Sequence, residues 1–267
     1  MVFYRYNSLE DYLISNPLTV DGQLDDGWGA SFPVKGTEIE ATILYSDISY
    51  FSARTLELSS TEILIFVNNF FAWITAEALR ETHGIVDKYI GDEIMIVFSK
   101  EFGSNDPFKE AVNAARWMSE HDALDFCPHI GIASGLVTVG YVGTPLKYSC
   151  SVFGTPVTYA NRCTSVTPET ENVGKSRIVF RASEWKNRSF EEVVPPVKDI
   201  YPDGVEKERP SSWKLLEPRT LDLKNIGKLE VRELVNNCVY FPEISMEERA
   251  KESLKLLRQA GFYRPLS

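Results

Sequence analysis

The fold is decided by the stretch VDKYIGDEIMIVF at residues 86–98. Two short apolar runs, 85–90 and 93–98, lie on either side of Gly91 and Asp92. A two-residue connection that begins with glycine is typical of a tight β-hairpin. We therefore predict an antiparallel hairpin with Asp92 at its tip.

Helices are predicted on both sides of this hairpin in the sequence. Residues 59–82 carry apolar side chains near a 3.6-residue period and begin with a capping-box pattern, Ser59 followed by Glu62. Asp106-Pro107 supplies the N-cap and first residue of a second helix, and Thr155-Pro156 begins a third.

Strands are predicted between and after these helices. They fall at 39–46, 148–153, 176–182 and 226–235, and residues 129–142 are predicted to form a hairpin or strand pair. Because the strands pair as hairpins and alternate with helices, we predict an α+β fold with a largely antiparallel sheet. We divide the chain into an N-terminal extension (1–37), one domain (38–240) with a Pro-rich loop excursion (195–219), and a helical tail (241–267) containing a helix at 245–259.

The composition excludes several classes of protein. The chain has 267 residues, 43% of them hydrophobic, which is enough for a packed core. Its 28 basic and 38 acidic residues give a net charge of −10 without a basic stripe, so nucleic-acid binding is not expected. Four cysteines without a CxxC pair argue against a zinc site and a disulfide framework. No signal peptide or membrane-spanning run stands out, so a cytoplasmic location is expected.

Two aspartates are candidates for a metal site. Asp47 ends the strand predicted at 39–46, and Asp92 lies at the hairpin tip. Carboxylates at such positions repel one another unless a cation such as Mg²⁺ or Mn²⁺ neutralises them. For either residue alone, a role in capping or in the turn is the simpler explanation.

Cationic residues on other segments would suit a triphosphate. They are Lys88, Lys147, Arg162 and Lys224, and Thr158 lies one helical turn before Arg162. Each of them alone is explained as a solvated surface charge. The residues by themselves do not show that these groups converge.

Five segments, in order, resemble motifs of the class III nucleotidyl cyclases. They are YSDISYFS (45–52), VDKYIGDEIMIVF (86–98), HIGIASGLVTVGYVG (129–143), SVFGTPVTYANR (151–162) and LKNIGKLEVREL (223–234). The resemblance implies a ferredoxin-like α+β domain that acts as a head-to-tail homodimer with its active sites at the interface. It also implies the reaction, in which the ribose 3′-hydroxyl attacks the α-phosphate to give a 3′,5′-cyclic nucleotide and pyrophosphate.

The resemblance also implies roles for individual residues. Two Mg²⁺ or Mn²⁺ ions would be held by Asp47, Asp92 and the carbonyl of Ile48. Arg162 would stabilise the transition state, and Lys224 and Lys147 would bind phosphates. Lys88 and Ser151 fall on the two base-reading positions.

Three residues depart from the usual purine cyclase. Tyr50 replaces a glycine, Thr158 replaces a ribose-orienting asparagine, and Ser151 stands where adenylate cyclases often have aspartate. A tyrosine at residue 50 in a cyclase resembles the pyrimidine cyclases of bacterial anti-phage (Pycsar) systems. Arg54 is expected to reach the base or the phosphates from the same helical face.

We therefore predict a uridylate cyclase that converts UTP to cUMP. CTP is the second pyrimidine candidate. The product would act on a separate effector that senses the cyclic nucleotide during anti-phage defence. The alternatives are an adenylate cyclase that makes cAMP, favoured by the Lys88 and Ser151 pair, and a catalytically inactive domain that binds nucleotide.

Overall fold

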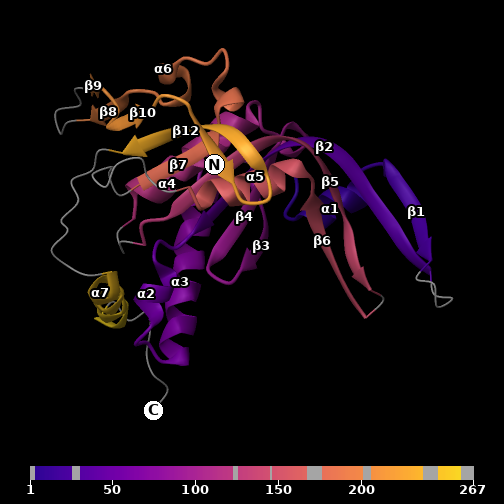
Figure 1. The fold of residues 1–267 in the computed structure, drawn as a ribbon, viewed down its shortest axis with the longest axis horizontal. Helices are drawn as coiled ribbons and strands as arrows, with labels where there is room; N and C mark the ends of the chain where they lie inside the picture. The colour runs from indigo at the N-terminus through magenta and orange to yellow at the C-terminus, as the bar shows by residue number, and fades with distance from the viewer. Residues whose placement is uncertain are drawn as a thin grey trace.

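A computed structural model of the chain describes residues 4–25, 31–122, 126–144, 146–166, 176–200, 206–236 and 246–259. Within these ranges the centre of the molecule is a ten-stranded sheet with the main order β10-β12-β7-β5-β2-β4-β3 (Figure 1). Strands β1, β6 and β11 pair at its margins with β2, β5 and β12, and β8 and β9 form a separate two-stranded sheet.

The strand bounds show how far the sheet extends along the chain. They are β1 (Val20–Asp25), β2 (Ser31–Asp47), β3 (Ile85–Ile90), β4 (Glu93–Ser99), β5 (His129–Thr144), β6 (Lys147–Phe153), β7 (Ser176–Arg181), β8 (Val197–Ile200), β9 (Glu206–Arg209), β10 (Trp213–Leu215), β11 (Arg219–Leu223) and β12 (Gly227–Asn236). In the described chain β5 and β7 are parallel and the other pairs are antiparallel. The predicted α+β class with a largely antiparallel sheet is confirmed.

Helices cover both faces of this sheet. They are α1 (Leu9–Ser15), α2 (Phe51–Thr55), α3 (Ser60–Leu79), α4 (Pro107–Glu120), α5 (Thr155–Thr164), α6 (Phe190–Val193) and α7 (Met246–Gln259), with 3₁₀ turns η1 (Lys100–Phe102) and η2 (Ala182–Trp185). Helices α3 and α4 pack on one face, where Phe66 and Phe70 meet Leu44 and Ile96. On the opposite face Ala160 of α5 joins a second core. Successive side chains at the end of β2 therefore point alternately toward α5 and toward α3.

The local sequence signals that predicted these elements are confirmed. The capping box of α3 is present, since Ser59 Oγ accepts from the Glu62 amide and the Glu62 carboxylate accepts from the Ser59 amide. Gly91 has a φ of 64° in the turn between β3 and β4. That left-handed conformation is open to glycine at little steric cost, and it leaves Asp92 at the hairpin tip.

Two predictions about strands are wrong. Residues 129–142 do not form a hairpin, because the single strand β5 pairs with β2 from His129 to Gly140 without a turn. The long strand β2 supplies hydrogen bonds along the whole of this segment. The glycines of β5 therefore allow close packing and do not form a turn that reverses the chain. The region 195–219 is more than a loop excursion, since it contains β8, β9, β10 and the start of β11.

The segment predicted as an N-terminal extension contributes to the sheet. Strand β1 pairs with residues 31–36 of β2, so β2 begins eight residues earlier than the predicted start at residue 39. In α1, Leu9 and Tyr12 are buried in the core that also contains Phe102. The described part of the first 37 residues thus extends the sheet at one margin and covers part of its α5 face.

Helix α3 is long and apolar enough to cross a membrane, judged by length and composition alone. Its buried residues Phe66, Phe70 and Ile74 belong to the main core cluster. In the described structure this apolar character is therefore used, along one side of the helix, for packing against the sheet.

The C-terminal helix packs back on the domain. The predicted helix at 245–259 is present as α7, and its proposed cap Ser245 lies outside the described residues. Leu254 is buried in the main core, and Lys251 Nζ lies 2.5 Å from Glu57 Oε2, close to the end of α2. Figure 1 shows α7 beside α2, the short helix that follows Asp47 in the chain.

Candidate functional site

A row of ionisable side chains crosses the sheet at the end of β2. Asp47 lies opposite Glu93 of β4 on one side and His129 of β5 on the other, and His129 lies opposite Arg177 of β7. Residues directly opposite one another point to the same face of a sheet. This face is the one covered by α5, because Tyr45, two residues before Asp47, shares a core with Ala160.

Asp47 is a partly buried carboxylate whose charge Arg177 offsets only in part. Burial, Asp92 and Glu93 raise the pKa of Asp47 to about 7. Its Oδ1 is buried without a hydrogen-bond partner among the described residues, and His129 Nδ1 lies 3.8 Å from it. Burial, with the charges of Arg177 and Arg54, lowers the pKa of His129 to about 4, so its ring is neutral at pH 7 and does not act as the counter-ion.

These features fit a divalent cation. Asp92 is half-buried at the tip of the hairpin, and burial raises its pKa too. An unpaired buried carboxylate oxygen beside a second carboxylate is the arrangement that a hard cation stabilises. Among the described residues no three His, Cys, Asp or Glu side chains are grouped to hold a metal. Asp47 and Asp92 would therefore share the ion with the carbonyl of buried Ile48 and with ligands from outside the chain.

A cavity of about 470 Å³ lies where α5 ends beside the β11–β12 hairpin. Arg162, predicted to stabilise the transition state, and Lys224, predicted to bind phosphates, line it together with Arg219. Arg162 Nε is buried and has no hydrogen-bond partner in the described chain. A cavity lined by three cations is suited to an anion such as a phosphate chain. Asp222 also lines it and offsets part of this positive charge.

Arg219 was not predicted from the sequence. Its guanidinium is held by the buried carboxylate of Glu233, with Nε and Nη2 at 2.8 and 2.5 Å from Oε1. Strand alternation was the one feature of the sequence that could have indicated it. Arg219 shares a strand face with Leu221 and Leu223, just before the predicted site residue Lys224.

The cavity and the ionisable row adjoin one another. Asn161 Nδ2 donates to Glu93 Oε2 at 3.3 Å. Burial and Asp92 raise the pKa of Glu93, and Asn161 and Arg162 are close enough to oppose part of that rise. The last turn of α5 thus connects the phosphate-sized cavity to the strand opposite Asp47.

The two predicted base-reading residues lie in contact. Lys88 Nζ donates to Ser151 Oγ at 2.5 Å, and Ser151 Oγ donates to Asp87 Oδ2 at 2.8 Å. A register shift between β3 and β4 at residues 86–88 marks a β-bulge. Strand alternation would put Asp87 and Lys88 on opposite faces, but the bulge lets both reach Ser151. Asp87 was missed for this reason.

Tyr50 has a backbone conformation that favours glycine. Its φ of 56° and ψ of 33° place it in the left-handed region, which costs a bulky residue roughly 1–2 kcal/mol. The side chain is 62% exposed, and its ring meets the His129 ring edge-on with centroids 6.3 Å apart. The ring thus stands in the open beside the ionisable row, at the N-terminus of α2.

One predicted site residue is placed elsewhere. Arg54 does not reach a base or phosphates, and that prediction is wrong for this structure. Its side chain is fully buried, with Nε 2.7 Å from the carbonyl of Ser49 and Nη2 3.3 Å from that of Phe126. The guanidinium instead joins the Asp47 loop to the segment that leads into β5.

In the described structure Lys147 and Thr158 make no hydrogen bond or ion pair with Asp47 or Asp92. Lys147 begins β6 at the end of the long β5–β6 hairpin, which extends away from the β3–β4 hairpin in Figure 1. Thr158 lies exposed on α5, one turn before Arg162. Both side chains are free to meet another molecule.

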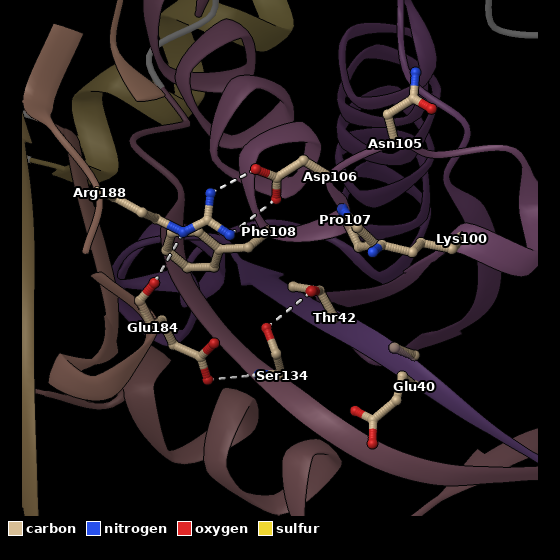
Figure 2. Close-up of a pocket in the computed structure, with 11 residues that line it drawn as sticks. Glu40, Thr42, Lys100, Asn105, Asp106, Pro107, Phe108, Ser134, Glu184 and Arg188 are labelled. Atoms are coloured by element: carbon tan, nitrogen blue, oxygen red, sulfur yellow. Dashed lines mark hydrogen bonds and ion pairs between the residues drawn. The ribbon is translucent and has the colours of Figure 1, made fainter. Parts of the chain in front are cut away.

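A second cavity of about 490 Å³ lies on the α4 face of the sheet (Figure 2). None of the predicted site residues lines it. Arg188 reaches Asp106 at the start of α4, with Nη1–Oδ2 and Nη2–Oδ1 distances of 2.5 and 3.1 Å, and lies 5.1 Å from the centre of the Phe108 ring. This wall is a structural clamp, because Asp106 also caps α4 by accepting from the Lys109 amide.

The clamp makes stability depend on pH. Burial tends to raise the pKa of Asp106, but Arg188 and the Lys109 amide outweigh it and lower that pKa. A lowered carboxyl pKa stabilises the fold above the unfolded value, near 4, and this contribution is lost as pH falls through the folded value. We expect Asp106→Ala to cost about 2 kcal/mol at pH 7 in urea unfolding, and the difference from wild type to shrink below pH 4. Asp106→Asn keeps the cap and should lose about half as much unfolding free energy. If Asp106→Ala lost the same unfolding free energy at pH 7 and at pH 3, the ion pair would not be the source of the pH dependence.

The sequence is similar to those of known nucleotide cyclases. The family model described as the adenylate and guanylate cyclase catalytic domain matches residues 34–179. An adenylate cyclase of Anabaena cylindrica is 31% identical over 145 residues, which cover 48% of this chain and 27% of that protein. An uncharacterised protein of Mycobacterium tuberculosis is 26% identical over 130 residues, covering 48% of this chain and 24% of its own length. The chain thus matches about a quarter of the length of these relatives.

Solved structures show the same fold. The adenylyl cyclase CyaB of P. aeruginosa superimposes with a TM-score of 0.55 at 17% identity, covering 79% of this chain and 99% of that one. The guanylate cyclase domain of RhGC from Catenaria anguillulae, solved in complex with GTP, gives 0.56 at 19% identity, with 75% and 98% covered. At these identities the likeness concerns the fold.

Proposed function

Because the chain belongs to the adenylate and guanylate cyclase catalytic domain family, we propose that it converts UTP to 3′,5′-cyclic UMP and pyrophosphate. The observation that carries the catalytic part is the unpaired buried Oδ1 of Asp47 beside Asp92. A buried carboxylate oxygen left without a hydrogen-bond partner beside a second carboxylate is difficult to explain in a purely structural site. The cavity lined by Arg162, Arg219 and Lys224 supplies the complementary positive charge.

The proposed reaction forms a bond between the ribose O3′ and the α-phosphorus and breaks the bond from that phosphorus to the bridging oxygen of the β-phosphate. The 3′-hydroxyl proton passes to solvent, and pyrophosphate leaves with the bond electrons. Divalent metal, when bound by Asp47 and Asp92, would lower the pKa of the attacking hydroxyl and neutralise phosphate charge. Arg162 would donate to the α-phosphate oxygens as their charge grows, and Lys224 and Arg219 would hold the leaving pyrophosphate.

We propose that the active enzyme is a head-to-tail homodimer. One protomer would give Asp47, Asp92 and the Ile48 carbonyl, and its partner would give the base contacts and Arg162. The exposure of Thr158 and the extended β5–β6 hairpin carrying Lys147 support a partner on the α5 face.

The choice of a pyrimidine rests on Tyr50. In place of the hydrogen of a glycine, an exposed aromatic ring stands next to the ionisable row. Such a ring fills space that the second ring of a purine would need, and it can stack on a pyrimidine. ATP is the second candidate substrate, because the Anabaena relative is named an adenylate cyclase and Lys88 occupies a base-reading position.

Tyr50→Gly tests the base choice. It should lower kcat/KM for UTP by about tenfold to a hundredfold and narrow the gap to ATP, because both size exclusion and stacking are lost. The readout is product mass with Mn²⁺ and each of the four nucleoside triphosphates. The same change should not lower the melting temperature, since glycine relieves the left-handed backbone strain.

Asn187→Gly provides a matched control for the backbone effect. Asn187 also has a positive φ, of 63°, and lies away from the site in the turn after η2. The Asn187→Gly substitution should leave the substrate preference unchanged. A wild-type enzyme that makes cAMP faster than cUMP at equal substrate would exclude the pyrimidine proposal and favour the adenylate cyclase.

We also propose that the cyclic product is a messenger in anti-phage defence, on the resemblance of the Tyr50 motif to pyrimidine cyclases of that system. Cells that carry the chain with its neighbouring genes should accumulate cUMP after phage infection. Loss of protection in an Asp47→Ala strain would support this role, and undiminished protection would exclude it.

A further inference from the structure

Asp87 is a buried carboxylate that the proposed reaction does not use. Its side chain has no exposed surface, whereas the side chain of its neighbour Lys88 is 37% exposed. Asp87 Oδ2 accepts from Ser151 Oγ at 2.8 Å and lies 3.2 Å from Lys88 Nζ. The β-bulge at residues 86–88 places both side chains at Ser151 of β6.

These contacts use the full donor capacity of Ser151. A serine hydroxyl has one proton, and a carboxylate can only accept, so that proton points to Asp87. Lys88 Nζ donates to the same oxygen at 2.5 Å. Ser151 is itself only 1% exposed. The serine therefore has no proton left for a base, and it lies too deep to present one.

Lys88 is the member of the cluster that remains available. Its ammonium has three protons, of which Ser151 and Asp87 engage two. The third is free for a ligand on the exposed side. Asp87 itself cannot accept from a base amino group, because it has no exposed surface. The cluster thus presents a single cationic donor.

We infer that Asp87 is a positioning residue for base choice, which fixes Ser151 as an acceptor and leaves Lys88 to select a base that offers a carbonyl oxygen at C4. The inference rests on the proposed function and makes it more specific. Uracil has a carbonyl at C4, where cytosine has an amino group. A lysine donor therefore favours uracil and leaves the cytosine amino group without a partner.

The test compares UTP and CTP in the full-length enzyme with Mn²⁺. Asp87→Ala removes the carboxylate that orients Ser151 and helps to hold Lys88 Nζ. The ratio of kcat/KM for UTP to that for CTP should therefore fall by about tenfold, mainly through KM. Ser151→Ala removes the anchored acceptor and should lower the ratio similarly. The double variant should lower it no further than either single change, because both act through one cluster.

Asp87→Asn separates positioning from structural support. The asparagine oxygen can still accept from Ser151, so this variant should keep the ratio within about threefold of wild type. Glu38→Gln, which alters an exposed carboxylate of β2, is the matched control and should change nothing. Binding of 3′-deoxy-UTP and 3′-deoxy-CTP, which lack the attacking hydroxyl, gives the same comparison without turnover.

The outcomes distinguish the two proposals. A wild-type enzyme that prefers UTP but whose ratio is unchanged in Asp87→Ala, with kcat lowered equally for both substrates, overturns the inference and leaves the uridylate cyclase standing. A wild-type enzyme that makes chiefly cAMP or cCMP overturns both. A tenfold loss of preference in Asp87→Ala that Asp87→Asn largely restores supports the inference.

Discussion

Asp47→Ala and Asp92→Ala are each expected to lower cyclic-nucleotide formation by at least about a thousandfold. Each removes one of the two carboxylates proposed to hold the divalent ions, and among the described residues no three His, Cys, Asp or Glu side chains are grouped to hold a metal without them. The fold should survive, because the Asp47 carboxylate is already unfavourable when charged. Its pKa of about 7 means that this carboxyl costs folding free energy progressively as the pH rises from the unfolded value, near 4, to about 7, so above that window the alanine variant should be equally or more stable.

The experiment follows product by mass and stability by thermal unfolding, with and without Mn²⁺. Glu38→Ala is the control, since Glu38 is an exposed carboxylate on the same strand as Asp47. Mn²⁺ with a nucleotide should raise the melting temperature of wild type and of Glu38→Ala, but not of the aspartate variants. Turnover within tenfold of wild type in either aspartate variant would remove it from the metal site.

Much of the fold was predictable because local signals coincide with its elements. The Gly91-Asp92 turn, the Ser59 cap and the Asp106-Pro107 start each act within a few residues. The single strand β5 was not predictable in the same way. Its glycines resemble turn residues, and only the long strand β2, about a hundred residues earlier in the chain, shows that the segment stays extended.

The site residues likewise include some that local motifs predict and some that they do not. Asp47, Asp92, Arg162 and Lys224 were predicted from motifs. The structure has Asp92 close enough to Asp47 to raise its pKa, and Arg162 and Lys224 line one cavity. Arg54 was misassigned because helical spacing cannot show burial. Its guanidinium is used by backbone carbonyls, one of them at Phe126, far away in sequence.

Asp87 and Arg219 were missed for related reasons. A β-bulge reverses the face that strand alternation predicts for Asp87. Arg219 depends on Glu233, fourteen residues later, to hold it at the cavity. In both cases the position of the side chain is set by a partner strand, which the sequence does not identify.

The composite active site gives the second large prediction. Arg162→Ala should be as inactive as Asp47→Ala, because it removes the cation aimed at the α-phosphate. Mixed in equal amounts and allowed to exchange subunits, the two variants should regain activity. In the heterodimer, Asp47 of one protomer meets Arg162 of the other at one site, while the second site lacks both. Half of the dimers are then heterodimers with one intact site of two, so about a quarter of wild-type activity is expected.

A matched mixture removes the remaining ambiguity. Asp47→Ala mixed with Asp92→Ala should stay inactive, because both residues belong to the same half of the site and each heterodimer site lacks one of them. Subunit exchange is verified by native mass spectrometry of differently tagged protomers, with Mn²⁺ present throughout. Recovery in the first mixture and none in the second places Asp47 and Arg162 on opposite sides of a shared site. Exchange without recovery in the first mixture would instead place Arg162 and Asp47 in one protomer's site, where neighbouring Asn161 contacts Glu93.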